Sequence, residues 1–380
     1  MNSDIIKKQL IEICLKKSPE NIARLLELWN NVGFLVHLSA AEIKILTMLL
    51  PELPDQTTKH SLELEVLQLN YRKKLHESRA TSLRLQQNLG DVLRVFNRLN
   101  VSPILLKGAA LLERWPQQFE NRAMTDIDLL IPYSMRLEVM DSLTKRGWRN
   151  ISNHGSYFTE WTHAFSMLTP NHLNVDVHWH LMPKIMALSF TEKLFQNSKL
   201  VSASGFSYLK MDLTHLFLHL CAHGIQKKSS DNLQWILDVF NLLKEEPHLN
   251  WEELFGVACE AHLSQEMSAA LSELVHYGLE IPDWVIQGLK NCPVSKIEIL
   301  EFKKNTEKEI RFREKTITVI FSEFLNWFFI WRARFRSKGI KMKPTDFLRY
   351  YGRSESLWKV VKMGPKLFID WLKLKSTSRI

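Results

Sequence analysis

The sequence has few cysteines, and they are widely separated. Its 380 residues include four of them, Cys14, Cys221, Cys259 and Cys292, and no two of these form a Cys-x-x-Cys pair. A disulfide framework or a cysteine zinc site is therefore not expected. A reducing cytoplasm is the predicted location.

Neither a cleavable leader nor a membrane-spanning hydrophobic run is expected. The N-terminal stretch MNSDIIKKQLIEICLKK interleaves acidic with apolar residues and has no small-residue cleavage site, which is typical of an amphipathic helix. The most apolar stretch runs from Ile317 to Trp331 and contains Glu323 and Asn326. A membrane-spanning helix needs roughly 20 apolar residues. No transmembrane helix is predicted, because this stretch is shorter than that.

The body of the chain lacks a basic excess, although the formal net charge is +9. Residues 301–380 hold 20 Lys and Arg against 8 Asp and Glu, whereas residues 1–300 hold 30 against 33. Any argument from basic charge to a binding partner therefore concerns the last 80 residues alone.

The aromatic and basic segment 317–380 admits several interpretations. Aromatic residues up to Trp331 precede the run Arg332-x-Arg334-x-Arg336-x-Lys338. The segment could be a solvated helical surface whose aromatics pack on the main body. It could also rest on an anionic membrane surface or bind nucleic acid through phosphates. Aromatics beside a cationic run favour the membrane over nucleic acid, so peripheral membrane association is an alternative to a purely cytoplasmic location.

Hydrophobic periodicity divides the chain into four predicted regions. Residues 1–99 and 201–300 follow the helical period, and 301–380 is the basic aromatic helical tail. Residues 100–200 alternate short apolar strands with helices, as a small α/β core does. The predicted fold class is α+β, with a mixed-sheet α/β core flanked by N-terminal and C-terminal helical regions.

Three short motifs follow one another along the predicted core. Lys107-Gly108 stands between an expected strand and an expected helix, Asp126-x-Asp128 begins the next expected strand, and Asp176 lies in a later one. Three carboxylates brought together repel one another unless cations neutralise them. Mg²⁺ suits such a group, because it takes carboxylate oxygens and leaves places for water and substrate phosphates.

Phosphate binding is the second chemistry that these motifs indicate. Without a side chain at Gly108, a triphosphate could approach the N–H groups of the following helix. Lys107 and Arg122 are candidates for neutralising the phosphate charge.

The order of these motifs resembles the nucleotidyltransferase superfamily typified by DNA polymerase β. Its signature is a glycine that opens a helix, an Asp-x-Asp strand and a third carboxylate on a later strand. More narrowly, the chain is similar over about residues 70–280 to an uncharacterised bacterial nucleotidyltransferase-like family. The segments that carry this similarity are Leu105-Leu-Lys-Gly108, Arg122-x-x-x-Asp126-Ile-Asp-Leu-Leu130, Val175-Asp-Val-His-Trp179, Leu216-x-x-His219-x-x-x-His223-Gly224 and Trp235-x-x-Asp238. Ala109 stands where the common superfamily motif has serine.

The resemblance implies transfer of a nucleoside monophosphate from a nucleoside triphosphate, such as ATP, to a hydroxyl group. Two Mg²⁺ ions would be held by the catalytic carboxylates of Asp126, Asp128 and Asp176. Asp176 would also help to activate the acceptor. The nucleotide would be bound by Lys107, Gly108 and Arg122. The acceptor stays open between a small molecule, a protein and an RNA.

Three histidines are candidates for lining the pocket: His178, His219 and His223. His219 and His223 are four residues apart on one helical face, a spacing that zinc ligands also use, but no third ligand follows in the sequence. Packing or substrate contact is therefore favoured for them. A rival interpretation is a catalytically inactive nucleotidyltransferase-like binding or regulatory protein of the toxin–antitoxin kind. The presence of all three carboxylates favours the enzyme.

Overall fold

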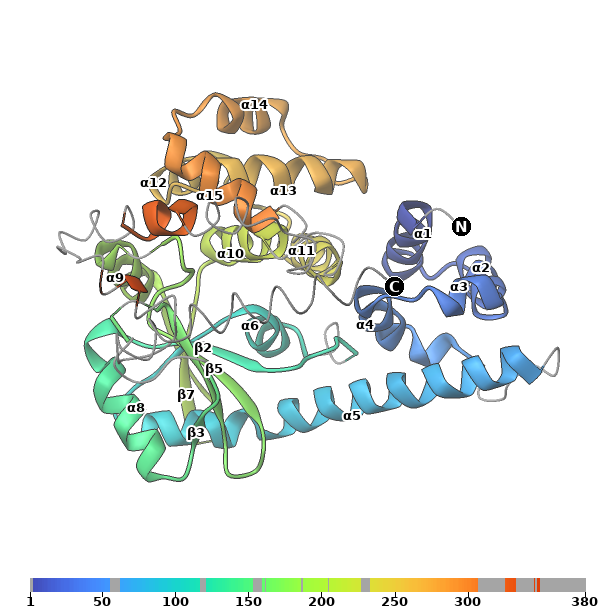
Figure 1. The fold of residues 1–380 in the computed structure, drawn as a ribbon, viewed down its shortest axis with the longest axis horizontal. Coiled ribbons are helices and arrows are strands. Elements are labelled where there is room, and N and C mark those ends of the chain that lie inside the picture. The colour runs from blue at the N-terminus through green and yellow to red at the C-terminus, as the bar shows by residue number, and fades with distance from the viewer. Residues whose placement is uncertain are drawn as a thin grey trace, which may run out of the picture.

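The computed structural model describes residues 3–54, 62–116, 121–152, 159–160, 162–185, 187–203, 205–226, 233–306, 325–332, 345 and 347–348. Within these residues a mixed β-sheet is surrounded by helices (Figure 1). The predicted α+β fold class is confirmed. No helix in this part of the chain combines the length and hydropathy that crossing a membrane requires.

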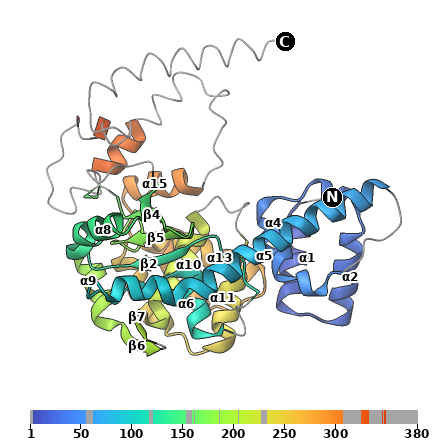
Figure 2. The same ribbon diagram turned by 90° about the horizontal axis from the view of Figure 1, so that it is seen from below.

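The N-terminal region is helical, and local sequence signals set where its helices begin. Its elements are α1 (Ser3–Leu15), α2 (Pro19–Trp29), α3 (Val32–Val36), α4 (Ala40–Met48), η1 (Leu50–Glu52) and α5 (Leu62–Asn97). The Ser18 hydroxyl accepts a hydrogen bond from the Asn21 N–H at the start of α2. Ser39 and Glu42 form a capping box at the start of α4. Figures 1 and 2 show α1–α4 beside the N-terminal half of α5, while its other half runs along the sheet.

In the part of the chain that the structure describes, seven strands form one sheet in the order β3-β4-β5-β2-β1-β7-β6. Their bounds are β1 (Ile104–Leu105), β2 (Ile127–Leu130), β3 (Arg149–Asn150), β4 (Ala164–Leu168), β5 (Asn174–His178), β6 (Lys199–Ala203) and β7 (Phe206–Lys210), and the helices among them are α6 (Lys107–Arg114), η2 (Tyr133–Met135), α8 (Arg136–Lys145) and α9 (Leu188–Asn197). The pairs β1–β7 and β2–β5 are parallel, and the other neighbours are antiparallel.

The sheet continues past residue 200, where the α/β core was predicted to end. Strands β6 and β7 form a hairpin, and the Leu209 N–H donates to the Pro103 carbonyl 2.8 Å away, which joins β7 to β1. The hydrophobic pattern predicted no strand over these residues. In the structure the Leu200 side chain is 64% exposed, and Tyr208 is the buried residue of β7, so few apolar residues of this hairpin face the core. The division into four regions stays a prediction.

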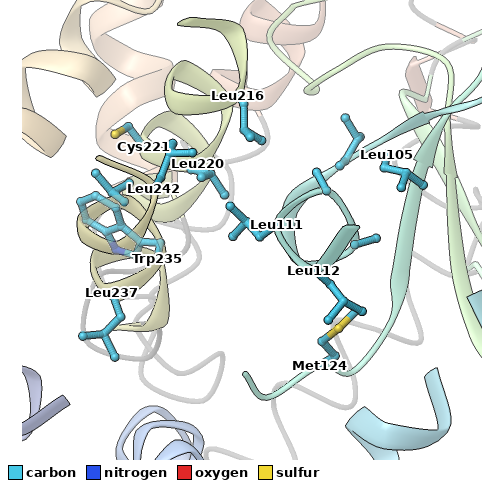
Figure 3. Packing of buried hydrophobic residues seen from close by; sticks show 14 of the residues in the cluster. Leu105, Leu111, Leu112, Met124, Leu216, Leu220, Cys221, Trp235, Leu237 and Leu242 are labelled. Carbon is cyan, nitrogen blue, oxygen red and sulfur yellow. The ribbon is translucent and has the colours of Figure 1, made fainter. Parts of the chain in front are cut away.

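The helical half after the sheet is built around one central helix. It comprises α10 (Leu213–Gln226), α11 (Gln234–Glu245), α12 (Trp251–Glu260), α13 (Ser264–His276), α14 (Asp283–Asn291) and α15 (Lys296–Thr306). Helix α10 is buried on almost every side and packs against α6, α11, α12 and α13. Figure 3 shows Leu111 of α6 pointing toward Leu216 and Leu220 of α10. Helix α6 is thus fixed between the sheet and the helical half.

Most of the basic aromatic tail lies outside the described residues. In the described part, the Trp331 and Phe347 side chains are buried, with ring centroids 5.1 Å apart, and the Phe328 ring lies 5.2 Å from that of Phe347. Phe329 is exposed. Some of these aromatics therefore pack internally. The predicted membrane or nucleic-acid contacts of 317–380 are not tested by them and stay predictions.

Candidate functional site

The pairing of β1 with β2 brings Lys107 beside Asp128. Leu105 lies opposite Leu129 in the antiparallel register, and the Leu106 N–H donates to the Asp128 carbonyl 3.1 Å away. The next residue, Lys107, begins α6 in the left-handed region with φ of 46°. The Lys107 Nζ lies 2.5 Å from the Asp128 Oδ1, so the two side chains form an ion pair.

The parallel pairing of β2 with β5 adds two further side chains to this point. Asp128 lies beside Asp176 in the register, and Leu130 lies beside His178. Side chains two residues apart on a strand share a face. Asp128, Asp176 and His178 each offer a ligand atom, and these atoms all lie within 4.8 Å of one another. We call these three residues the ligand cluster.

Asp126 precedes β2 and lies in a different setting from the ligand cluster. It lines a pocket together with Asp128. Asp128 therefore belongs both to this pocket and to the ligand cluster. The pocket contains equal numbers of basic and acidic side chains, namely Lys44, Lys107, Arg122, Asp126, Asp128 and Asp238. Within the described residues, the group close enough to share an ion thus contains His178 where the family resemblance implied Asp126.

Asp128 is ionised although its side chain is almost completely buried. Burial alone would raise the pKa of this carboxyl, but Lys107 and His178 outweigh it and hold the pKa well below its usual range. Burial alone would likewise lower the pKa of Lys107, but the charge of Asp128, with smaller contributions from Asp126 and Asp176, raises it. The His178 Nε2 lies 3.1 Å from the same Asp128 oxygen. The site therefore holds a charged pair before any metal ion is considered.

Arg122 is held by a second buried carboxylate. Its Nε and Nη2 donate to the two oxygens of Asp238 at 2.8 and 2.7 Å, which is a bidentate pair. A Cβ atom on Gly108 would lie 2.3 Å from the Arg122 Nη1. The space beside Gly108 is therefore filled by the Arg122 guanidinium. This gives the glycine a packing reason besides the predicted approach of a triphosphate.

The three predicted pocket histidines occupy three different places. His223 lines the pocket, and His178 belongs to the ligand cluster. His219 is completely buried on α10, and neither of its ring nitrogens has a hydrogen-bond partner among the described residues. Burial, and then the charges of Lys107 and His178, lower the pKa of His219 to about 3. His219 is therefore neutral at ordinary pH.

Several residues that shape the pocket were not predicted from the sequence. Lys44 comes from α4, more than 60 residues before Lys107, and no local pattern distinguishes it from other lysines. The Gln234 amide donates to the Ala123 carbonyl 3.0 Å away, and the Ser82 hydroxyl accepts from the Met124 N–H at 2.8 Å. Both contacts fix the segment before β2. The motif Trp235-x-x-Asp238 was the available signal for the carboxylate that holds Arg122.

The donor atoms of the ligand cluster, carboxylate oxygens and an imidazole nitrogen, suit a divalent cation. Two carboxylates and one imidazole are a common ligand type for such ions, and His178 has a buried Nδ1 with no hydrogen-bond partner among the described residues. A cation bound by this cluster would lie beside the Asp128 oxygen that already pairs with Lys107.

Comparison with known proteins gives a family match over most of the chain. Residues 36–276 match a family described as uncharacterised nucleotidyltransferase. No curated protein matches the chain. The crystal structure of an antigenic nucleotidyltransferase-like protein from Paracoccidioides brasiliensis is similar at 16% sequence identity and a TM-score of 0.32, covering 56% of this chain and 93% of that one. Because the family match spans more than half of its residues, the chain belongs to this uncharacterised nucleotidyltransferase family.

Proposed function

We propose that the protein is a metal-dependent nucleotidyltransferase that moves a nucleoside monophosphate from a nucleoside triphosphate, such as ATP, to a hydroxyl acceptor. The observation that carries the proposal is the grouping of Asp128, Asp176 and His178 within 4.8 Å, next to a charged pocket. Membership of the nucleotidyltransferase family supports the same reaction class.

The carboxylates provide the part of the site that would hold Mg²⁺. Asp128 and Asp176 would bind it together with His178, and the resemblance implies a second ion shared with Asp126. When bound, such ions stabilise negative charge on the attacking and leaving oxygens of a phosphoryl group. Asp176 is partly exposed, so its carboxylate can accept the proton of an acceptor hydroxyl.

The basic side chains of the pocket would bind and orient the phosphates. Lys44, Lys107 and Arg122 line the pocket, and Lys107 and Arg122 also pair with Asp128 and Asp238. Lys44 reaches the pocket from α4 and adds a third basic group to the two that the sequence predicted. The acceptor is a small molecule, a protein or an RNA. Cytoplasmic location and bacterial origin stay predictions.

Radiolabelled nucleotides test the proposal directly. The full chain is incubated with Mg²⁺, each α-³²P-labelled triphosphate and cell extract, and Mg·ATP binding is measured by titration calorimetry. We expect label in one class of acceptor, and at least about 100-fold less label with Asp176→Asn because a metal-binding charge is lost. Asp141→Asn, on the exposed surface of α8, is the matched control and should label normally. Absence of both binding and labelling in the natural protein would contradict the proposal.

One observation favours a second candidate function, a catalytically inactive binding protein. The Lys107–Asp128 ion pair already neutralises the most buried carboxylate of the ligand cluster without a metal ion. Nucleotide binding that persists in Asp176→Asn, with no label transferred by either protein, would support this alternative.

A further inference from the structure

Two cysteines that are far apart in the sequence meet in the helical half. Cys259 lies in the last turn of α12, and Cys292 directly follows α14. Their Sγ atoms are 2.6 Å apart, and both residues are free thiols. The sequence spacing did not indicate this contact, because 33 positions separate the two residues and no Cys-x-x-Cys motif joins them.

The two cysteines of this pair are more exposed to solvent than Cys221, which is the most buried cysteine. Cys259 and Cys292 are partly exposed, whereas Cys221 is completely buried within α10. Both also lie at helix ends, where the backbone adjusts more easily than in the middle of a helix. A small oxidant can therefore reach the pair, and the chain can accommodate a new bond between its sulfur atoms.

Metal binding does not explain the pair. Among the residues that the structure describes, the ligand group close enough to share an ion consists of Asp128, Asp176 and His178 and includes no cysteine. His262, which follows α12, is paired instead with Glu298, with 3.0 Å between Nδ1 and Oε1. Two facing thiols without further ligands are placed for oxidation.

We propose that Cys259 and Cys292 are a redox-modification site that forms an intramolecular disulfide on exposure to hydrogen peroxide. One thiolate attacks a peroxide oxygen, which gives a sulfenic acid and, after protonation of the leaving hydroxide, one water. The second thiol sulfur then attacks the sulfenic sulfur, so that the S–S bond forms and a second water leaves. Two thiols and one peroxide thus yield one disulfide and two waters.

The disulfide would act on the helical layer that supports the pocket. It would join α12 to α14, which pack directly against each other. Both helices also contact α13, which packs on α10, the helix that carries His219 and His223. A covalent link between residues 259 and 292 restricts the unfolded chain and so favours the folded one. Neither cysteine lines the pocket, so this inference does not depend on the proposed function.

Thiol counting on the full chain tests the proposal. The reduced protein is treated with hydrogen peroxide, denatured and titrated for free thiols, and its peptides are mapped by mass spectrometry. We expect the count to fall from four to two and a linked pair of peptides that contains Cys259 and Cys292. Oxidation should also raise the melting temperature by about 5 °C, reversibly with a reductant.

Serine variants identify which cysteines react. Cys259→Ser and Cys292→Ser should each abolish the cross-link and the rise in melting temperature, whereas Cys14→Ser should retain both. Four free thiols after oxidation, or a link that involves Cys14 or Cys221, would overturn the proposal. So would oxidation of Cys259 and Cys292 to separate sulfinic acids.

Discussion

Asp128 connects the ligand cluster to the pocket. A carboxylate as deeply buried as this one is tolerated because an ammonium group and an imidazole lie against the same oxygen. Lys107 reaches that oxygen because a single residue, Leu106, separates it from β1, and its positive φ turns the chain into α6. In the proposed reaction a cation would bind beside Asp128, and the positive charge of Lys107 already lies there.

Lys107→Met should therefore make stability depend on metal ions. Without metal, removing one partner of a buried ion pair costs about 3 kcal/mol of the free energy of unfolding. Added Mg²⁺ should restore part of this loss, because a bound cation then neutralises Asp128. The measurement is denaturant unfolding with EDTA and with Mg²⁺.

The control for this experiment is Lys145→Met, in the exposed pair with Asp141 on α8. It should change the free energy of unfolding by no more than about 0.5 kcal/mol under either condition. A Lys107 variant that is as stable as this control would show that the buried pair does not stabilise the fold.

His219 should make the protein less stable as the pH falls from 6.5 toward 3. Its pKa is lowered to about 3 in the folded chain by burial, whereas an unfolded histidine has a pKa near 6.5. Between these values the unfolded state binds the extra proton, so stability falls by roughly 1.4 kcal/mol per pH unit for this one group. His219→Asn should remove that slope from a series of denaturation curves.

The matched control replaces an exposed histidine. His172→Asn, in the turn between β4 and β5, should retain the slope that His219 causes, and asparagine tolerates the positive φ of that position. An unchanged slope in His219→Asn would contradict the assignment of His219 as a neutral buried group.

At the scale of elements, close packing between helices holds the pocket together. Trp235 of α11 lies across Gly224 of α10, and a Cβ on this glycine would come within 2.2 Å of the indole ring. Both helices contribute pocket residues, Leu220 and His223 from one and Gln234 and Asp238 from the other. The absence of a side chain at Gly224 therefore sets how closely these two walls approach.

Gly224→Ala should destabilise the protein by about 3 kcal/mol, because a rigid indole ring has to move. Gly256→Ala is the control in another helix, α12. It is exposed, and nothing lies within 4 Å of the added Cβ, so the same substitution should stabilise by about 0.5 to 1 kcal/mol. Thermal denaturation of the two variants measures both effects, and equal shifts would show that Trp235 does not limit the packing.

At the scale of the whole molecule, the pocket draws on three parts of the chain. Lys44 comes from the N-terminal helices, Lys107 and Asp128 come from the sheet region, and Asp238 comes from the helical half. Figure 1 shows α4 beside α11, and these two helices are in contact. The N-terminal helices are therefore part of the site and not a separate appendage.

Lys44→Gln should weaken the binding of Mg·ATP by about tenfold, since one charge-assisted phosphate contact is lost. The fold should be as stable as in the natural protein, because Lys44 is only partly buried. Lys8→Gln, on the exposed surface of α1, is the control and should bind normally. If the natural protein binds nucleotide and Lys44→Gln binds it equally well, α4 does not contribute to phosphate recognition.

Much of the secondary structure could be predicted because its signals are local. The helical period over 61–99 predicts α5, and capping at Ser18 and Ser39 predicts where α2 and α4 begin. Apolar runs around Asp128 and Asp176 predict β2 and β5. The hairpin β6–β7 was missed because its Leu200 is exposed and its partner, β1, lies about 100 residues earlier.

The amino-acid sequence alone determined the order of most elements and the residue types of the site: a lysine and glycine at a helix start, and three aspartates on or beside strands. Only the tertiary structure decided how they combine, because these choices depend on strand register and helix packing between distant segments. The register placed His178 with Asp128 and Asp176. Helix packing placed Arg122 beside Asp238, with which it forms an ion pair, and placed Cys259 in contact with Cys292. Two of the four scarce cysteines, which are far apart along the chain, thus meet as a pair in space.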